Sequence, residues 1–314
     1  MTLAALNQSI AAIPAPVRGL LLIVLASAFF ASMHNTIRFI AQTEDIHPFE
    51  VAFFRVAFGL IVFIPFFLRS GIGILRTHKF SWHFGRAFLN AASMLSWFTA
   101  LSLMPVGDAT AVSLIGPVFV AILAMLFLGE HVGPMRWLGI LLAVVGGLIV
   151  VRPGFVDISS GVWLVLFSAV AVSFSKLIAK VLTGIESPTT IVAYMTILMI
   201  PITFVPAIFV WQTPTLEQLG FMALIGVFGT LGHLLFVQAY KLADMSLVEP
   251  AMFTRMIWAA LISLVLFAEF PTPWTWAGAG VIVVGTTLLA RKEARREPRR
   301  ADPNASTVDP SPGD

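Results

Sequence analysis

The chain has 314 residues, of which 58% are apolar and only 11% are charged, and its mean hydropathy is +0.94. Soluble domains carry roughly 25% charged residues because water must solvate their surface, so this composition excludes an ordinary soluble protein. The lack of cysteine excludes disulfides and thiolate metal sites. The net charge of +3 indicates little about partners, because six of the 19 lysines and arginines lie together near the C-terminus.

Long apolar stretches predict an all-α integral membrane protein, because a helix needs about 20 apolar residues to cross a hydrocarbon core of roughly 30 Å. Residues 1–17 form a mostly apolar lead with no basic residue before Arg18, which favours a retained first span over a cleaved signal. Breaks rich in proline and glycine separate the spans. We expect ten spans, with nine or eleven as alternative counts, at residues 19–40, 50–69, 85–104, 108–128, 134–151, 160–183, 189–210, 217–241, 246–267 and 273–290.

The distribution of lysine and arginine predicts the orientation of the spans, because basic residues collect on the cytoplasmic side. If the chain starts in the cytoplasm, eight basic residues in loops and six in the tail fall on that side, 14 in all. Only Arg38 and Arg152 fall outside, and three lie within spans: Arg55, Lys176 and Arg255. We therefore expect an even number of spans and two cytoplasmic termini. Residues 291–314, rich in charge, proline and serine, are expected to form a disordered cytoplasmic tail.

An internal repeat emerges when the sequence is shifted by 139 residues. Matched pairs include Glu130 with Glu269, Pro134 with Pro273, Trp137 with Trp276, Gly139 with Gly278 and Gly146 with Gly285. Each copy holds five predicted spans, an odd number, so the second copy must be inverted in the membrane. The pattern predicts two inverted five-helix repeats at residues 18–151 and 152–290, an architecture typical of secondary transporters with a substrate site near the midplane.

The motifs within these copies point to a family. The first copy contains Ala100-Leu-Ser-Leu-Met-Pro-Val-Gly-Asp-Ala-Thr-Ala, Gly116-Pro117, Leu128-Gly-Glu130, Trp137-Leu-Gly and Gly146-Gly, and the second contains Glu269, Trp276-Ala-Gly278 and Gly285. Over about residues 18–291 the chain closely resembles the EamA repeats of the drug/metabolite transporter superfamily. This resemblance implies ten helices, cytoplasmic termini and alternating access without an ATP site. It also implies a multi-pass protein of the bacterial cytoplasmic (inner) membrane.

The same resemblance implies a small organic metabolite as the solute: amino-acid-like, carboxylate-bearing or cofactor-like. Import of a cofactor such as S-adenosylmethionine or riboflavin is the alternative within the class. The expected partners are the solute, the bilayer and a coupled proton or counter-substrate, with no nucleic acid.

Charged residues inside spans are the first candidates for the substrate site, because a central Lys, Arg or Asp costs about 2.5–3.5 kcal/mol on insertion scales. Arg255 lies near the middle of the ninth span and is predicted to bind the solute, with a structural ion pair as the alternative. Glu249, six residues earlier, falls on a different helix face. It is a candidate for solute binding and proton coupling, or marks the helix end. Lys176 and His233 would complete a cationic vestibule suited to a carboxylate.

Three further residues are candidates. Asn90 and Trp97 follow the third span at helical spacing with Ser93, and they offer a hydrogen-bonding group and a stacking surface for a solute. Their alternative role is helix packing. His34 is a candidate for proton coupling because histidine titrates near physiological pH, and a hydrogen-bonded packing histidine is the alternative.

Other functional classes lack their motifs. The sequence contains no His-Glu-x-x-His, no Gly-x-Ser-x-Gly and no glycine-rich nucleotide loop with its lysine. It also lacks the ring of like charge or the filter-like loop of a channel. An intramembrane enzyme or a channel is therefore the disfavoured alternative, and no catalytic residue, metal ligand or cofactor is predicted.

Overall fold

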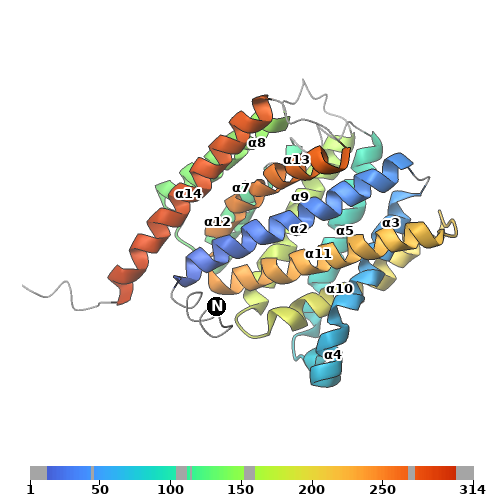
Figure 1. Ribbon diagram of the computed structural model, residues 1–314. Coiled ribbons are helices and arrows are strands. Elements are labelled where there is room, and N and C mark those ends of the chain that lie inside the picture. The colour runs from blue at the N-terminus through green and yellow to red at the C-terminus, as the bar shows by residue number, and fades with distance from the viewer. Residues whose placement is uncertain are drawn as a thin grey trace, which may run out of the picture.

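The computed structural model describes residues 13–43, 46–103, 112, 113, 115–151, 160–267 and 273–301. All regular secondary structure within these ranges is helical (Figure 1). The elements are α2 (Ala15–Thr43), α3 (Pro48–Gly59), η1 (Leu60–Phe63), α4 (Ile64–Ser70), η2 (Gly71–Leu75), α5 (Phe80–Leu103), α7 (Gly116–Leu128), α8 (Pro134–Val151), α9 (Ser160–Leu182), α10 (Pro188–Ile208), α11 (Leu216–Leu242), α12 (Met245–Val248), η3 (Glu249–Phe253), α13 (Thr254–Phe267) and α14 (Pro273–Ala301).

Every predicted span overlaps helical structure. The second span comprises α3, the 3-10 segment η1 and α4, and the ninth comprises α12, the 3-10 segment η3 and α13. Within the described residues, six helical segments are long and apolar enough to cross a membrane, and α7 and part of α8 form shorter apolar helices. The chain is thus built as a multi-pass membrane protein, and the count of ten spans stays a prediction.

One expectation is corrected at the C-terminal end. The disordered tail was expected from residue 291, but α14 continues to Ala301. Residues 291–301 are mostly Arg, Lys, Glu and Ala, whose high helix propensity extends the helix although the segment has almost no apolar side chains to bury. The lead before residue 13, the motif residues 104–111, the linker 152–159, the matched Glu269 and residues 302–314 lie outside the described residues.

The two sequence copies pack on each other reciprocally. Helix α2 of the first copy lies along α11 of the second. Their counterparts at the 139-residue shift are α9 and α5, and these two helices also lie along each other. Likewise α3 contacts α11 as α10 contacts α5, and α13 contacts α2 as α7 contacts α9. The last helices of the two copies, α8 and α14, pack side by side (Figure 1). Such reciprocal contacts are those of an isologous pair, so the 139-residue repeat is confirmed in three dimensions.

Glycines set the closeness of α8 and α14. A Cβ atom on Gly146 would lie 2.8 Å from the carbonyl oxygen of Gly278, and one on its counterpart Gly285 would lie 3.0 Å from the Cβ of Leu142. Gly146 and Gly285 therefore permit the close approach of these two helices.

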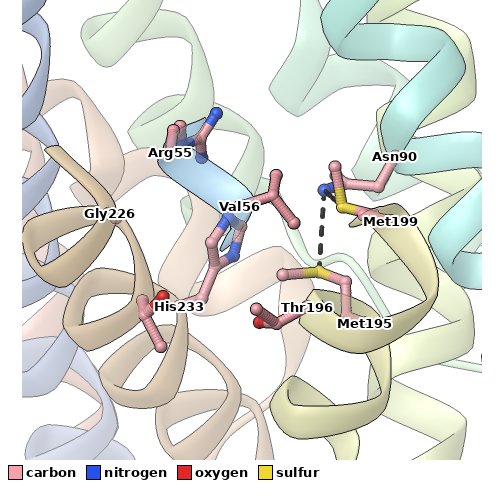
Figure 2. A pocket seen from close by; sticks show the side chains of 10 residues that line it. Arg55, Val56, Asn90, Met195, Thr196, Met199, Gly226 and His233 are labelled. Carbon is pink, nitrogen blue, oxygen red and sulfur yellow. Dashed lines mark hydrogen bonds between the residues drawn. The ribbon is translucent and has the colours of Figure 1, made fainter. Parts of the chain in front are cut away.

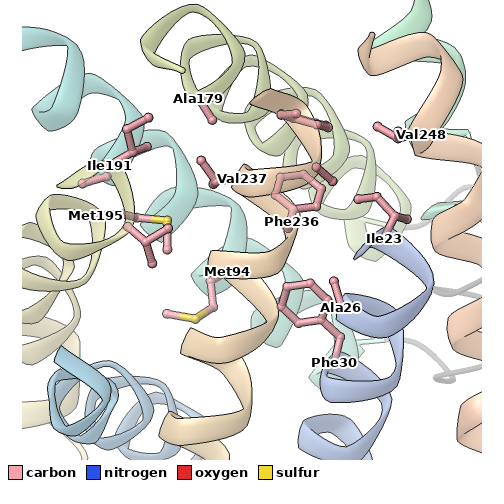
Figure 3. Packing of buried hydrophobic residues seen from close by; sticks show 14 of the residues in the cluster. Ile23, Ala26, Phe30, Met94, Ala179, Ile191, Met195, Phe236, Val237 and Val248 are labelled. Atoms are coloured by element: carbon pink, nitrogen blue, oxygen red, sulfur yellow. The ribbon is translucent and has the colours of Figure 1, made fainter. Parts of the chain in front are cut away.

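The largest apolar cluster lies where α2, α5, α9, α10 and α11 meet. In Figure 3, Ala26 and Phe30 of α2 face Phe236 of α11. Polar side chains also join the helices: the Ser93 hydroxyl of α5 and the Ser168 hydroxyl of α9 lie 2.9 Å apart and are buried. Ser93 thus joins two packed helices, which is the packing role that the sequence offers as the alternative for the polar residues of this span.

A partly buried polar network positions the start of α12. The Glu130 carboxylate accepts hydrogen bonds from the backbone N–H groups of Met245 (2.9 Å) and Ser246 (3.2 Å). A carboxylate at this position complements the partial positive charge of a helix N-terminus. Arg136 donates to Asp244 (2.7 Å) and to the Ser246 hydroxyl (3.0 Å). The turn between α11 and α12 is therefore tied to α7 and α8, which places the following segment η3.

Candidate functional site

A cavity lies among α3, α5, α10 and α11, so both sequence copies contribute to its wall (Figure 2). Its interior volume is about 20 Å³, which is room for about one water molecule. Ligand pockets commonly measure roughly 300–1,000 Å³, so in this conformation the cavity is far too small for an organic solute. The lining residues are Arg55, Val56, Asn90, Met195, Thr196, Met199, Gly226, Gly229, Thr230 and His233.

The cavity lies between equivalent positions of the repeat. Val56 and Met195 both line it and are 139 residues apart, and so are Asn90 and Gly229. Residues that face one cavity from equivalent positions of two copies lie around the axis that relates the copies. This is where transporters built from repeats hold their solutes.

Arg55 brings a positive charge to the cavity without a carboxylate partner. Within the part of the chain that the structure describes, its Nη1 donates to the thioether sulfur of Met94 alone, at 3.0 Å. Among the described residues no acidic side chain hydrogen-bonds or pairs with this guanidinium, and no acidic residue lines the cavity. Gly229 makes room for it, because a Cβ on that glycine would lie 3.1 Å from Arg55 Nε.

Asn90 and His233 are also left with weak partners. The Asn90 side-chain amide donates to the sulfur atoms of Met199 (3.3 Å) and Met195 (3.6 Å). In Figure 2 these groups lie on one side of the cavity, and Arg55 and His233 lie on the other. The His233 Nδ1 atom is buried and has no hydrogen-bond partner among the described residues.

The chemistry of the cavity follows from this shortage of acceptors. Buried polar groups are normally paired with strong partners, and thioether sulfur is a weak acceptor. A guanidinium, an amide and an imidazole from two copies therefore share a space in which the described residues offer them sulfur acceptors or none. A solute with acceptor oxygens would supply what they lack, and the polarizable methionine side chains suit an aromatic ring.

A second polar cluster joins Lys176 to Glu249. The Lys176 ammonium lies 2.7 Å from Glu249 Oε2, and the Tyr240 hydroxyl donates to Glu249 Oε1. The Glu249 side chain is 2% exposed and that of Lys176 is 22% exposed. One turn along α9, Lys180 donates to two carbonyls at the end of α11, one of which is that of Tyr240. Lys176 and Glu249 are thus brought together by the fold, although neither lines the cavity.

The other predicted site residues are placed differently. Arg255 does not line the cavity and makes no hydrogen bond or ion pair with another described residue, although it lies within electrostatic range of His34 and Glu249. The His34 Nδ1–H donates to the Phe30 carbonyl within α2 (2.6 Å). Trp97 packs against a small apolar cluster away from the cavity. Of the six residues predicted to bind solute, Asn90 and His233 line the cavity.

A hydrogen bond and aromatic contacts join the start of α3 to the loop after α10. The buried Glu50 carboxylate accepts a hydrogen bond from the backbone N–H of Gln212, in the loop after α10. The neighbouring Trp211 ring packs on Phe53 and Phe54, with ring centroids 6.0 and 5.5 Å apart. We call this group of five residues the α3 closure.

Where α10 begins, a related closure holds the loop before α5. Glu186 accepts hydrogen bonds from His83 Nε2 (2.7 Å) and from the Thr77 hydroxyl. The His83 ring stacks on Tyr194 at 4.4 Å, and the Tyr194 hydroxyl donates to the Leu75 carbonyl. We call these five residues the α10 closure. Because α3 and α10 are counterparts, each closure joins the start of one helix to the loop after its counterpart.

Arg55 was missed as a principal site residue by reasoning from the sequence. Its cationic side chain within an apolar span was one signal. A second signal was that Arg55 lies in the span directly before the one that carries Asn90, within the same copy. Neither signal indicates which way a side chain points around a helix.

Comparison with known proteins identifies the family. The model of the EamA-like transporter family matches residues 17–152 and again residues 159–291. The chain belongs to the EamA-like transporter family. The two matches coincide with the two reciprocal halves of the fold, so this EamA protein contains two copies of the family's repeat.

Several relatives of this EamA protein are named for the solutes they carry. The riboflavin transporter of Rhizobium johnstonii is 31% identical over 285 residues, covering 90% of this chain and 94% of the relative. The S-adenosylmethionine uptake transporter of Rickettsia bellii is 30% identical over 250 residues, covering 80% and 86%. The pseudopaline exporter of Pseudomonas aeruginosa is 28% identical over 283 residues, covering 87% and 96%. These relatives support a small-molecule transporter.

A solved crystal structure of a protein has the same fold. It matches with a TM-score of 0.75 and 17% identity, and the match covers 90% of this chain and 98% of that chain. At this identity the likeness concerns the fold alone.

Proposed function

We propose that this EamA protein is a secondary transporter that moves a small organic solute by alternating access between its two halves, with the solute held in the cavity around Arg55. The observation that carries the proposal is the cavity itself. It lies between equivalent positions of the two copies, and among the described residues Arg55 and Asn90 donate to thioether sulfur and His233 Nδ1 has no partner. A site between repeats can open to either side when the halves exchange conformations.

The proposed topology is ten transmembrane helices in two inverted repeats, with both termini in the cytoplasm of a bacterial cell and the chain in its cytoplasmic (inner) membrane. The 14 basic residues on one side against two on the other support this orientation. The bacterial relatives and the six helical segments long enough to span a bilayer agree with it.

The two closures fit such a cycle. The α3 closure would lie on the outer side and the α10 closure on the cytoplasmic side. Both are formed in the structure, which accords with the small size of the cavity. Transport would require each closure to open in turn.

The solute we propose carries a carboxylate or the carbonyl oxygens of a planar heterocycle. Both classes offer acceptors to Arg55 and Asn90, and a flavin ring offers its carbonyl edge in addition to an aromatic surface for the methionines. Hydrogen bonds to a charged donor such as a guanidinium are worth about 1.5–3 kcal/mol. Among the solutes named for the relatives, riboflavin therefore suits the chemistry of the lining residues, and its binding would require the cavity to widen.

S-adenosylmethionine is the alternative that relatives with 30% identity suggest. Its sulfonium and ammonium groups give it a net positive charge. The described lining offers these groups a guanidinium and no carboxylate. We therefore rank this solute below riboflavin and carboxylate-bearing metabolites.

Counterflow in proteoliposomes tests the proposal. Vesicles loaded with riboflavin, glutamate or S-adenosylmethionine are diluted into the same labelled solute, and exchange is followed in wild type, Arg55→Gln and Arg76→Gln. Arg76 is exposed in the loop before α5 and serves as the matched control. We expect saturable exchange of riboflavin or glutamate that Arg55→Gln impairs and Arg76→Gln leaves intact. Exchange unaffected by Arg55→Gln would refute the site, and no exchange of any solute would refute the transporter.

A further inference from the structure

The Lys176–Glu249 pair lies on the side of α11 that leads to the cavity. His233, Phe236 and Tyr240 follow one another at spacings of three and four residues, which puts them on one face of that helix. Tyr240 holds Glu249, and the Lys176 ammonium lies 5.5 Å from the centre of the Phe236 ring. Phe236 in turn contacts the His233 ring, with centroids 6.4 Å apart. A continuous row of side chains therefore connects the ion pair to the cavity.

Glu249 stands where its helix is interrupted. It begins the 3-10 segment Glu249–Phe253, which separates α12 from α13 and contains Pro250. Interrupted helices in transporters place ion and solute groups at such breaks. Glu249 therefore occupies the kind of position at which transporters bind coupling ions.

The charged and titratable groups around Glu249 come from several helices. Lys176 of α9 and Tyr240 of α11 contact it, and Arg255 of α13 lies within electrostatic range. Glu130 and Arg86 act on Tyr240 from farther away. The cations of this region thus outnumber its carboxylates, and Glu249 is the acidic residue that directly neutralises Lys176.

A buried ion pair can also be purely structural, and the removal of one partner is then strongly destabilising. Two features argue for more than a structural role here. The Lys176 side chain keeps 22% exposure, so the pair is open on one side. The pair also links the interrupted helix to the row that ends in a cavity short of acceptors.

On the basis of the proposed transport function, we infer that the Lys176–Glu249 pair is a proton-binding site that couples solute movement to proton movement in the same direction. A proton adds to Glu249 Oε2, which becomes neutral and releases the Lys176 ammonium. The ammonium keeps its charge and adds to the positive potential at the cavity, which strengthens the binding of an acceptor-rich or anionic solute. By reciprocity the bound solute favours the protonated carboxyl to the same extent.

Comparison of exchange with net uptake tests this inference. Counterflow needs only the loaded carrier to move between its two sides, whereas accumulation driven by a pH gradient also needs the proton to bind and leave. Proteoliposomes containing the pH dye pyranine are used with whichever of riboflavin and glutamate the wild type exchanges. We expect Glu249→Gln, which resembles the protonated residue, to keep counterflow and to lose both gradient-driven accumulation and solute-linked acidification of the lumen.

Glu217→Gln is the matched control, because Glu217 is an exposed glutamate in the first turn of α11 and should leave both activities intact. In wild type, solute affinity should rise by about 5- to 150-fold, the usual range of coupling, as the pH is lowered. Glu249→Gln should remove this dependence on pH. The double variant Lys176→Gln with Glu249→Gln removes both charges together and should still exchange solute without accumulation.

Gradient-driven accumulation by Glu249→Gln would overturn the coupling role. Loss of counterflow in both Glu249→Gln and the double variant would also overturn it, because the pair would then be structural or part of the solute site. In either case wild-type counterflow would leave the proposed transport function standing. Its absence for every solute would refute that function and this inference together.

Discussion

Substitution of Gly226 by alanine examines the contact between α3 and α11 that forms one wall of the cavity. A Cβ at this position would lie 2.8 Å from Arg55 O, 2.8 Å from Gly59 N and 3.0 Å from Phe58 C. All three atoms belong to the backbone of α3 or its C-terminal end, so no side-chain rotation can relieve the contact. Because non-bonded heavy atoms prefer separations of about 3.5–4.0 Å, the helices must separate by roughly 0.5–1 Å.

Gly220→Ala provides the matched control. Gly220 lies on the same helix as Gly226, and a Cβ there would meet nothing within 4 Å. Alanine in a helix interior gains about 0.8–1.0 kcal/mol over glycine in either case. Overpacking costs typically 1–3 kcal/mol and applies only to Gly226→Ala. The difference between the two variants therefore isolates the α3–α11 contact, and it should amount to about 1–3 kcal/mol of unfolding free energy.

Thermal unfolding of the two purified variants in detergent, followed by tryptophan fluorescence, measures this difference. With about 2–4 °C per kcal/mol for chains of 150–250 residues, Gly226→Ala should have a midpoint roughly 2–12 °C below that of Gly220→Ala. Its counterflow rate should also fall, because the displaced α3 carries Arg55. Equal midpoints for the two variants would refute the close packing of α3 and α11.

Two further predictions concern the solute site and the closures. Arg55→Gln should raise the KM for counterflow by about 10- to 100-fold, which corresponds to a charge-assisted hydrogen bond of about 1.5–3 kcal/mol. Arg55→Lys should fall between Gln and wild type, because lysine keeps the charge and loses the paired donors, and equal KM values for the three proteins would contradict this role. Because the chain has no cysteine, Thr196→Cys would place a single thiol at the cavity. When Glu50→Gln is combined with Thr196→Cys, an impermeant reagent should label the thiol faster from the outer side. When Glu186→Gln is combined with Thr196→Cys, labelling should be faster from the cytoplasmic side. Faster labelling from the same side in both variants would refute alternating closures.

Much of the fold was predictable because it depends on quantities that add along the chain. The apolar stretches sum to spans whose expected positions all overlap helices, and the repeat emerged from matched residues such as Glu130 and Gly146 at one offset. The structure explains two of these matches. Glu130 caps the start of α12, and Gly146 lets α8 approach α14. The extension of α14 to Ala301 was not predicted, because helix propensity can continue a helix where no apolar face requires one.

The site was only partly predictable. Depth in the membrane made Arg255, Lys176, Glu249 and His233 candidates, and the expected vestibule separated into two groups in the structure. His233 lines the cavity, whereas Lys176 and Glu249 neutralise each other beside it. The sequence placed Glu249 on a different helix face from Arg255 and gave no indication that Lys176 would be its partner. Position along a span gives the height of a side chain, and its partner depends on which helix lies opposite.

The amino-acid sequence by itself determined that this protein lies in a membrane, that it consists of two copies of one helical unit, and that cations lie within its spans. Hydropathy, repetition and charge are properties of the chain that need no knowledge of helix rotation. Only the tertiary structure decided that Arg55 and His233 face Asn90 across a cavity between the copies. The direction of a side chain follows from how α3, α5, α10 and α11 pack, and that packing is a property of all four helices together.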